Sequence, residues 1–186
     1  MKTMTVEELM VPLAEYATVS SEATLYDAVK ALEKAQQDYN KSLYPHRAIL
    51  VYGENKKIIG KISQLDILRA LEPQYDQMIE KGGSLARFGF SLKFQKSMID
   101  QFKLWDEPFN DICEKAAKIK VQDFFYTPSQ GEYVKMGVTL DEAIHQLVMG
   151  HHQSLLVTKG DEIVGVLRLT DVFMAVFDAV MTTCKT

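Results

Sequence analysis

GKISQLD, the stretch Gly60–Asp66, returns later in the chain as GVLRLTD, the stretch Gly165–Asp171. In both copies an apolar run, a polar turn and two aliphatic residues precede the glycine, and a histidine stands fourteen residues before it (His46 and His151). This half of the repeat therefore has an offset of 105 residues, from Gly60 to Gly165. Self-similarity of this length predicts two copies of one supersecondary unit that bury their apolar faces against each other.

A second register holds further upstream. There the offset is 115 residues, because Val19 matches Val134 and Thr24 matches Thr139. The change from 115 to 105 means that the first copy carries ten extra residues, which we place near residues 33–43.

Composition limits the class of protein. The 186 residues are 47% hydrophobic and 25% charged, which is enough for one substantial core built from two small lobes. The net charge of −4 and the lack of a strongly basic block argue against nucleic-acid binding. Apolar stretches fall short of the roughly 20 residues that a membrane helix needs, and residues 1–10 lack the apolar core of a signal peptide. We therefore expect a soluble, cytoplasmic protein with neither a nucleic-acid nor a membrane partner.

Each copy has the pattern of a helical turn, a strand, a helix, two strands and a helix. In the first copy Thr5 is expected to cap the opening turn, and Ser21 or Thr24 the next helix. Short β-branched runs at 48–52 and 57–59, joined by a polar turn, predict a hairpin. After the closing aspartate of each copy, apolar residues recur at helical spacing.

This order of elements, with its Gly-x-x-(Ser/Thr)-x-x-Asp ending, resembles the cystathionine β-synthase (CBS) domain, here as a tandem pair or Bateman module. The resemblance covers about residues 1–72 and 118–183. It implies an α+β fold of two β-α-β-β-α repeats packed as a pseudo-twofold pair, with a mostly helical insertion between them. We accordingly divide the chain into a first repeat (1–72), an insertion (73–117) and a second repeat (118–186). Two clefts between the repeats would bind an adenosyl ligand such as AMP, ADP, ATP or S-adenosylmethionine, and a homodimer is common in the family.

The ending itself has two interpretations. A carboxylate at the start of a helix can accept hydrogen bonds from ribose hydroxyls, and phosphate can use free N–H groups and nearby cations. Ser, Thr and Asp at these positions can equally well do no more than cap their helices. The family resemblance favours ligand binding for Asp66 and Asp171.

Transferred residue by residue, the resemblance places Ser63 and Asp66 on the ribose and phosphate side of one cleft and Asp171 in the other. The second copy departs from the pattern, because Arg168 replaces the hydroxyl residue and Thr170 stands next to Asp171. Arg168 could pair with phosphate or block the cleft by its bulk. The two sites are therefore not expected to be equivalent.

Further contacts are expected from the first strands and from the histidine segments. Backbone groups of the first strands resemble those that contact adenine in the family; the alternative is that these residues only pack in the core. The basic residues before the second strands are candidates for the phosphate end of the ligand; the alternative is that they form a solvated pair on the surface. The residues concerned are Thr18, Val19, Tyr133, Val134 and Lys135 for adenine, and His46, Arg47 and His152, with its neighbour His151, for phosphate.

A metal site and a catalytic site are not expected. His145, His151 and His152 cluster in the sequence, but His145 is predicted to face outward, and acidic or thiol ligands do not complete a set. Cys113 and Cys184 lack metal-ligand or redox spacing, so we interpret both as ordinary thiols. Walker, nucleophile-elbow and paired metal motifs are also missing.

The insertion has an apolar face at helical spacing, formed by Met98, Phe102, Trp105, Phe109 and Ile112 or Cys113. Such a face would pack over its own module, form a dimer contact or dock a regulated partner protein. The sequence thus predicts a non-catalytic regulatory module that binds an adenosyl nucleotide. The alternative is an adaptor with empty clefts that docks a partner through residues 73–117.

Overall fold

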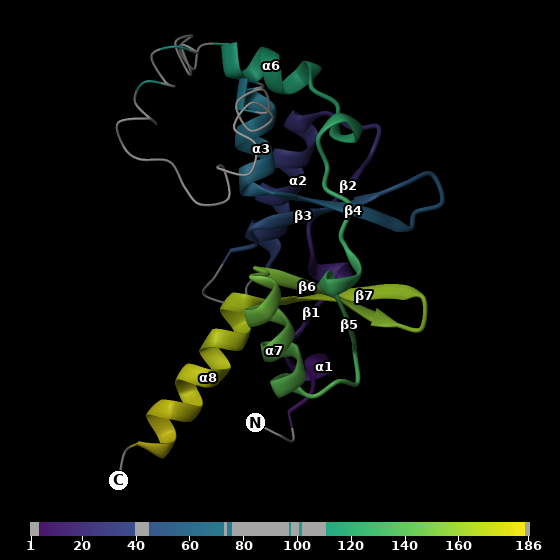
Figure 1. Ribbon diagram of the computed structural model, residues 1–186. Coiled ribbons are helices and arrows are strands. Elements are labelled where there is room, and N and C mark those ends of the chain that lie inside the picture. Colours follow the sequence, from purple (N-terminus) through teal and green to yellow (C-terminus); the bar gives the residue numbers. More distant parts are fainter. Residues whose placement is uncertain are drawn as a thin grey trace.

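A computed structural model describes residues 4–39, 45–72, 74, 75, 97, 101 and 111–184 (Figure 1). Two similar halves lie one above the other, and both mix helices with a small sheet, which confirms the predicted α+β class. Along the chain, the first repeat contributes α1 (Val6–Leu9), β1 (Val11–Pro12), β2 (Thr18–Ser20), α2 (Leu25–Asp38), β3 (Ala48–Tyr52), β4 (Ile58–Ser63) and α3 (Gln64–Leu71), of which α1 and β1 lie in the half formed by the second repeat. Helix α6 (Ile112–Lys118) follows and lies beside α2 and α3. The second repeat contributes β5 (Tyr133–Lys135), α7 (Leu140–Gly150), β6 (Ser154–Lys159), β7 (Glu162–Arg168) and α8 (Leu169–Thr183), and short 3-10 turns connect some of these elements.

The two sheets have the same construction. In the first, β2 pairs in parallel with β3, and β3 pairs in antiparallel fashion with β4. In the second, β5 is parallel to β6, and β6 is antiparallel to β7. The hairpins predicted from the β-branched runs are thus present in both repeats, as β3–β4 and β6–β7.

The opening segment of each repeat packs against the other repeat, and we call this arrangement the exchange of opening segments. Strand β1 pairs with β7, with Val11 opposite Val166, so the second sheet has the order β1-β7-β6-β5. In the opposite direction, Tyr126 forms a bridge with Lys61 of β4. The buried side chains follow the same exchange, because Val6 lies in the second repeat's core and Val121 in the first repeat's core.

The glycine of each repeated ending allows this exchange. A Cβ atom at Gly165 would lie 2.6 Å from the carbonyl oxygen of Val11, and one at Gly60 would lie 2.8 Å from the carbonyl oxygen of Tyr126. Only glycine leaves room for the backbone of the other repeat to lie this close. The glycine is therefore explained by packing between the repeats.

A third apolar cluster joins the two halves. It contains Leu50 of β3 and Leu156 of β6, together with Val11, Tyr16 and Val166. The two repeats thus bury apolar faces against each other, as the self-similarity predicts.

Strand pairing corrects one register of the sequence analysis. Val51 lies opposite Gly60, and Val157 lies opposite Gly165. Strands β3 and β6 are therefore 106 residues apart, because the second hairpin has a turn that is one residue shorter. The counterpart of His46 is accordingly His152, and the match with His151 was wrong.

Two other local expectations can be compared with the structure. Thr24 caps α2 through a capping box with Asp27, as predicted, but Thr5 makes no side-chain cap bond to α1. Part of the extra sequence in the first copy lengthens α2, which has 14 residues against 11 in α7. Residues 40–44 and most of the insertion, including Met98, Phe102, Trp105 and Phe109, lie outside the described residues.

Candidate functional site

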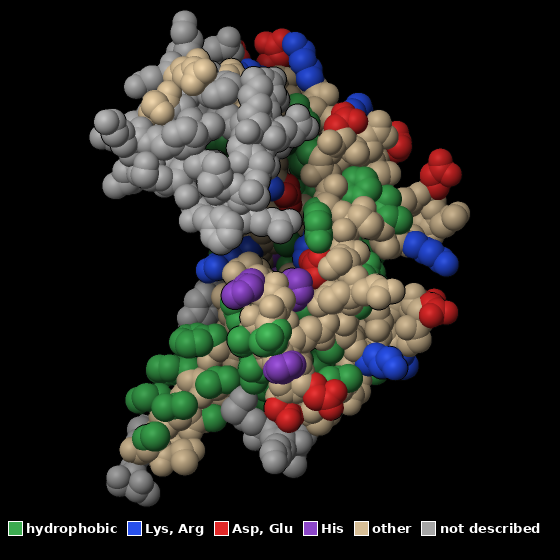
Figure 2. Space-filling view, viewed as in Figure 1, with side chains coloured by type: hydrophobic (Ala, Val, Ile, Leu, Met, Phe, Trp, Pro, Cys, Tyr) green, Lys and Arg blue, Asp and Glu red, His purple; other side chains and the backbone are tan. Residues whose placement is uncertain are grey.

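A cavity of about 580 Å³ lies between the two repeats. Its walls come from the end of β4 and the start of α3 in the first repeat, and from the segments around 126–132 and 150–154 in the second. Figure 2 shows histidine side chains (purple) near the boundary between the two halves and also on the lower half. We call this cavity the Asp66 cleft. Six of the predicted site residues line it: Arg47, Ser63, Asp66, His152, Arg168 and Thr170.

Ser63 and Asp66 cap helix α3 in a reciprocal arrangement. The Ser63 hydroxyl and backbone N–H donate to Asp66 Oδ2 over 2.6 and 2.8 Å, and the Asp66 N–H donates back to Ser63 Oγ over 3.3 Å. Asp66 Oδ1 faces Arg69 at the longer distance of 4.0 Å. The capping interpretation of this motif is therefore correct, and Oδ1 retains capacity to accept hydrogen bonds from a ligand.

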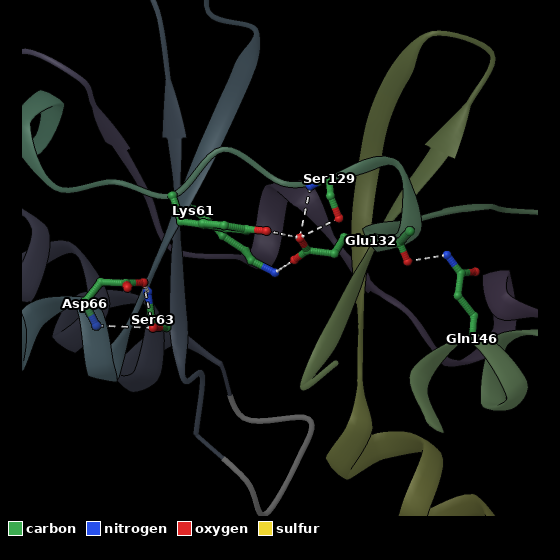
Figure 3. A network of polar contacts seen from close by, with 8 residues as sticks. Lys61, Ser63, Asp66, Ser129, Glu132 and Gln146 are labelled. Atoms are coloured by element: carbon green, nitrogen blue, oxygen red, sulfur yellow. Dashed lines mark hydrogen bonds and ion pairs between the residues drawn. The ribbon is translucent and has the colours of Figure 1, made fainter. Parts of the chain in front are cut away.

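A buried ion pair connects the two repeats beside the capping box (Figure 3). Lys61 Nζ on β4 contacts Glu132 Oε2, which belongs to the turn before β5. The other carboxylate oxygen, Oε1, accepts from the Tyr126 hydroxyl over 2.7 Å and from the Ser129 N–H over 3.0 Å. Burial alone would raise the pKa of Glu132, but the hydrogen bonds from Lys61, Tyr126 and Ser129 outweigh it and lower the pKa to about 2.

Basic side chains line the remainder of the cleft. Arg47 and His151 are exposed, and His152 is half-buried. His151 ends α7 in the left-handed conformation (φ 51°), a geometry that histidine tolerates better than most residues. The ring of His152 lies directly against Gly150, where an added Cβ would come within 2.0 Å of Nε2. These residues place a guanidinium and two imidazole rings around a cavity that also contains the N-terminus of α3.

The second ending has a different arrangement. Arg168 forms a bidentate pair with Asp171, with Nε donating to Oδ2 over 2.5 Å and Nη2 donating to Oδ1 over 2.6 Å. The guanidinium lies over the ring of Tyr39, 5.3 Å from its centroid, and Nη1 is 3.5 Å from His46 Nδ1. Burial and the positive charge of Arg168 lower the pKa of His46, so this histidine is held neutral against the pair.

The first-strand residues lie outside the Asp66 cleft. Val19 and Val134 point into the cores of their repeats, and Thr18 lines a separate cavity against α2. Tyr133, Val134 and Lys135 line a third cavity against α7. There the Gln146 amide donates to the carbonyl oxygens of Gly131 and Tyr133 over 2.6 and 2.9 Å (Figure 3). The edge of β5 is thus already hydrogen-bonded to a side chain of the chain itself.

Sequence reasoning missed Lys61, Tyr126 and Glu132. The repeat contained a signal for two of them, because Lys61 matches Val166 and Glu132 matches Ala17. Each copy thus has one charged residue where the other copy has an apolar one, and the two charges are of opposite sign. This difference between the copies is a signal for an ion pair. The missing information was the exchange of opening segments, which brings β4 next to residues 126–132.

Of the histidines that cluster in the sequence, His151 and His152 line the Asp66 cleft, whereas His145 lines the cavity against α7. His145 is exposed on α7, as predicted. Within the part of the chain that the structure describes, no group of three or more His, Cys, Asp or Glu side chains could hold a metal ion.

Comparison with known families identifies the repeat. The profile of the CBS domain matches residues 6–73 and 129–178, which together make up more than half of the chain. The chain belongs to the CBS domain family. Because the profile matches twice, it is a tandem CBS-domain protein, as the repeated ending predicts.

Solved structures of CBS-domain proteins have the same fold. CBSX2 in complex with AMP is 19% identical with a TM-score of 0.57, over 94% of this chain and 97% of that chain. A CBS domain-containing protein of unknown function from Bacillus anthracis is 16% identical with a TM-score of 0.61, over 95% of both chains. CBSX2 from Arabidopsis thaliana, described as a CBS-pair protein, is 18% identical with a TM-score of 0.58, over 96% and 97%. A search of curated proteins found no match.

Proteins with paired CBS domains are generally regulatory.

Among the helices that the structure describes, none has the length and apolar character needed to cross a bilayer.

Proposed function

We propose that this tandem CBS-domain protein is a non-catalytic regulatory module that binds an adenosyl nucleotide in the Asp66 cleft. The observation that carries the proposal is the convergence of a helix-start carboxylate with the basic residues Arg47, His151 and His152 around one cavity between the repeats. The AMP complex of CBSX2 supports the ligand class, since that protein has the same fold.

The polar groups of the cleft suit the two ends of a nucleotide. Asp66 keeps one oxygen, Oδ1, at 4.0 Å from its neighbour Arg69, so it can accept a ribose hydroxyl without losing its role as a cap. Arg47 and the histidines can neutralise phosphate at the exposed side. Lys61 is already paired with Glu132, so the phosphate end is assigned to Arg47 and the histidines.

Asp66→Ala is expected to weaken binding of AMP, ADP, ATP or S-adenosylmethionine, whichever binds most tightly, by roughly 10-fold to 100-fold, as expected for the loss of hydrogen bonds to a charged group. Isothermal titration calorimetry on nucleotide-stripped protein measures this change. Asp27→Ala is the matched control, because Asp27 makes the same capping box with Thr24 on α2, away from the cleft. Equal affinity in the Asp66 and Asp27 variants would contradict the assignment.

Regulation would follow from the position of the cleft. Its walls come from both repeats, so a bound nucleotide stabilises one arrangement of the repeats relative to others. A ligand shifts such an equilibrium only by the difference in its affinity for the two states. A response to the adenylate pool, and hence energy sensing in the cytoplasm, is the role proposed for this site.

We also propose a homodimer formed through α8 and its counterpart α3. Helix α8 extends away from the body of the molecule (Figure 1), and its side chains Phe173 and Phe177 are 60% and 44% exposed. On α3, Leu65 and Leu68 are also exposed. Two equivalent helices with apolar faces suit a two-fold interface, in which each face meets its own copy.

Phe177→Glu is expected to convert the dimer to a monomer, because it would bury a carboxylate in an apolar interface. Light scattering coupled to size-exclusion chromatography measures the mass. Val29→Glu on α2 is the control, since Val29 is also 44% exposed but lies on another face. A monomeric wild-type protein would contradict the proposed dimer.

A further inference from the structure

We propose that each chain binds one nucleotide, because the Arg168 side chain already binds the Asp171 carboxylate, which a second nucleotide would need. This inference rests on the proposed function of the Asp66 cleft. In this proposal the Arg168 side chain pairs with Asp171 in place of a ligand.

The two endings occupy equivalent places in the fold. Ser63 stands at the N-cap of α3 directly after β4, and Arg168 stands at the N-cap of α8 directly after β7. Asp66 and Asp171 are each the third residue of their helix. A ligand site at Asp66 therefore has a counterpart at Asp171 by the symmetry of the repeat.

The carboxylate at the second place is already engaged through both of its oxygens. Both oxygens of Asp171 accept hydrogen bonds from Arg168, over 2.5 and 2.6 Å, whereas at Asp66 only Oδ2 takes part in the capping box. Arg168 is 4% exposed, so the pair is shielded from solvent. A ribose could reach Asp171 only by displacing a buried, charge-assisted, bidentate contact.

The guanidinium packs beside a small group of aromatic rings. Tyr39 lies 5.3 Å from Arg168 Cζ, and the rings of Tyr16 and Tyr39 lie 4.5 and 4.6 Å from the ring of His46. The position of Tyr16 corresponds to Gly131 of the second repeat. At the matched positions the ending at Asp66 has the small residues Ser63 and Gly131, whereas the ending at Asp171 has the large residues Arg168 and Tyr16, which also reach the wall of the Asp66 cleft.

Breaking a buried ion pair is strongly unfavourable when one partner is left uncompensated. A nucleotide that had to do so would bind roughly 100-fold more weakly at Asp171 than at Asp66. Arg168 also offers phosphate little attraction, because its charge is balanced by Asp171. Both effects direct the ligand to the first cleft.

Calorimetric titration of the full chain with AMP, ADP, ATP and S-adenosylmethionine tests this inference through its stoichiometry. We expect one site per chain in the wild type, binding weakened by roughly 10-fold to 100-fold in Asp66→Ala, and still one site per chain in the double variant Arg168→Ser/Asp171→Ala. The double variant removes both partners, so it leaves no buried charge unpaired. Arg168→Ser alone recreates the residue of the first ending, and we expect it to gain a second, weaker site.

The outcomes separate this inference from the proposed function. Two sites in the wild type, or loss of binding in the double variant, would overturn the single-site inference and leave nucleotide binding standing. A single site in Arg168→Ser would overturn the role assigned to Arg168. Absence of binding by every wild-type titration would overturn the proposed function and the inference together.

Discussion

Glu132→Gln is expected to lower the free energy of unfolding by about 3 kcal/mol at neutral pH, because it leaves the ammonium of Lys61 buried without a counter-charge. Lys61 and Glu132 are 16% and 5% exposed in their side chains, and the pair connects β4 of the first repeat to the turn before β5 of the second. Loss of the pair therefore removes a direct connection between the repeats. Urea unfolding followed by circular dichroism measures the change.

The pH dependence gives a second measure of the same interaction. Hydrogen bonds lower the pKa of Glu132 to about 2 from its ordinary 4.5, so the carboxylate stabilises the folded state above pH 4.5. This stabilisation is lost as the pH falls from about 5 to about 2, and it amounts to roughly 3 kcal/mol. Wild-type stability should consequently drop further over this range than that of Glu132→Gln. Parallel profiles for the two proteins would contradict the assignment.

The repeat itself provides a control for the ion pair. Lys61 matches Val166, and Glu132 matches Ala17, so Lys61→Val combined with Glu132→Ala replaces both charges with the residues that the other copy uses. Replacing both partners of a buried pair with apolar residues is often nearly neutral. We expect the double variant to be more stable than either single variant. A double variant as unstable as the sum of the two single ones would show that Lys61 and Glu132 act independently.

The sequence predicted the fold because local and repeated signals agreed. Thr24 and Ser63, each followed three residues later by aspartate, marked the starts of α2 and α3, and the β-branched runs marked the hairpins. The register between His46 and His152 could not be obtained in this way. The turn of the second hairpin is one residue shorter, so the glycines match at an offset of 105 residues, but the residues before the turn match at an offset of 106.

The candidate site was predictable only in part, for a physical reason. Ser63, Asp66 and Arg47 line one cavity because they lie close to a single strand end, whereas Glu132 and Tyr126 come to the same cavity from the other repeat. That contact depends on the exchange of opening segments, which pattern matching within one copy does not reveal. The state of Arg168 likewise depends on Tyr39 and His46, which lie more than 120 residues away in the sequence.

Gly165→Val is expected to destabilise the protein by about 3 kcal/mol, since it forces a side chain into the backbone of the exchanged segment. A Cβ at this position would lie 2.6 Å from the Val11 carbonyl oxygen and 3.0 Å from Met10 Sδ, so β1 must move away from β7. That movement would also pull Val6 out of the second repeat's core, in which it is fully buried. Thermal unfolding and urea titration measure the loss.

Gly137→Ala is the matched control, because an added Cβ there meets no atom within 4 Å. This variant should be neutral or slightly more stable, because alanine restricts the unfolded chain. The same reasoning extends to Gly60, where a Cβ would lie 2.2 Å from the ring of Phe125 and 2.8 Å from the Tyr126 carbonyl oxygen. Gly60→Val and Gly165→Val should therefore destabilise the protein to a similar extent, one on each side of the exchange. If Gly165→Val were as stable as Gly137→Ala, β1 would not pair with β7 in solution, and the glycine of the repeated ending would need a different explanation.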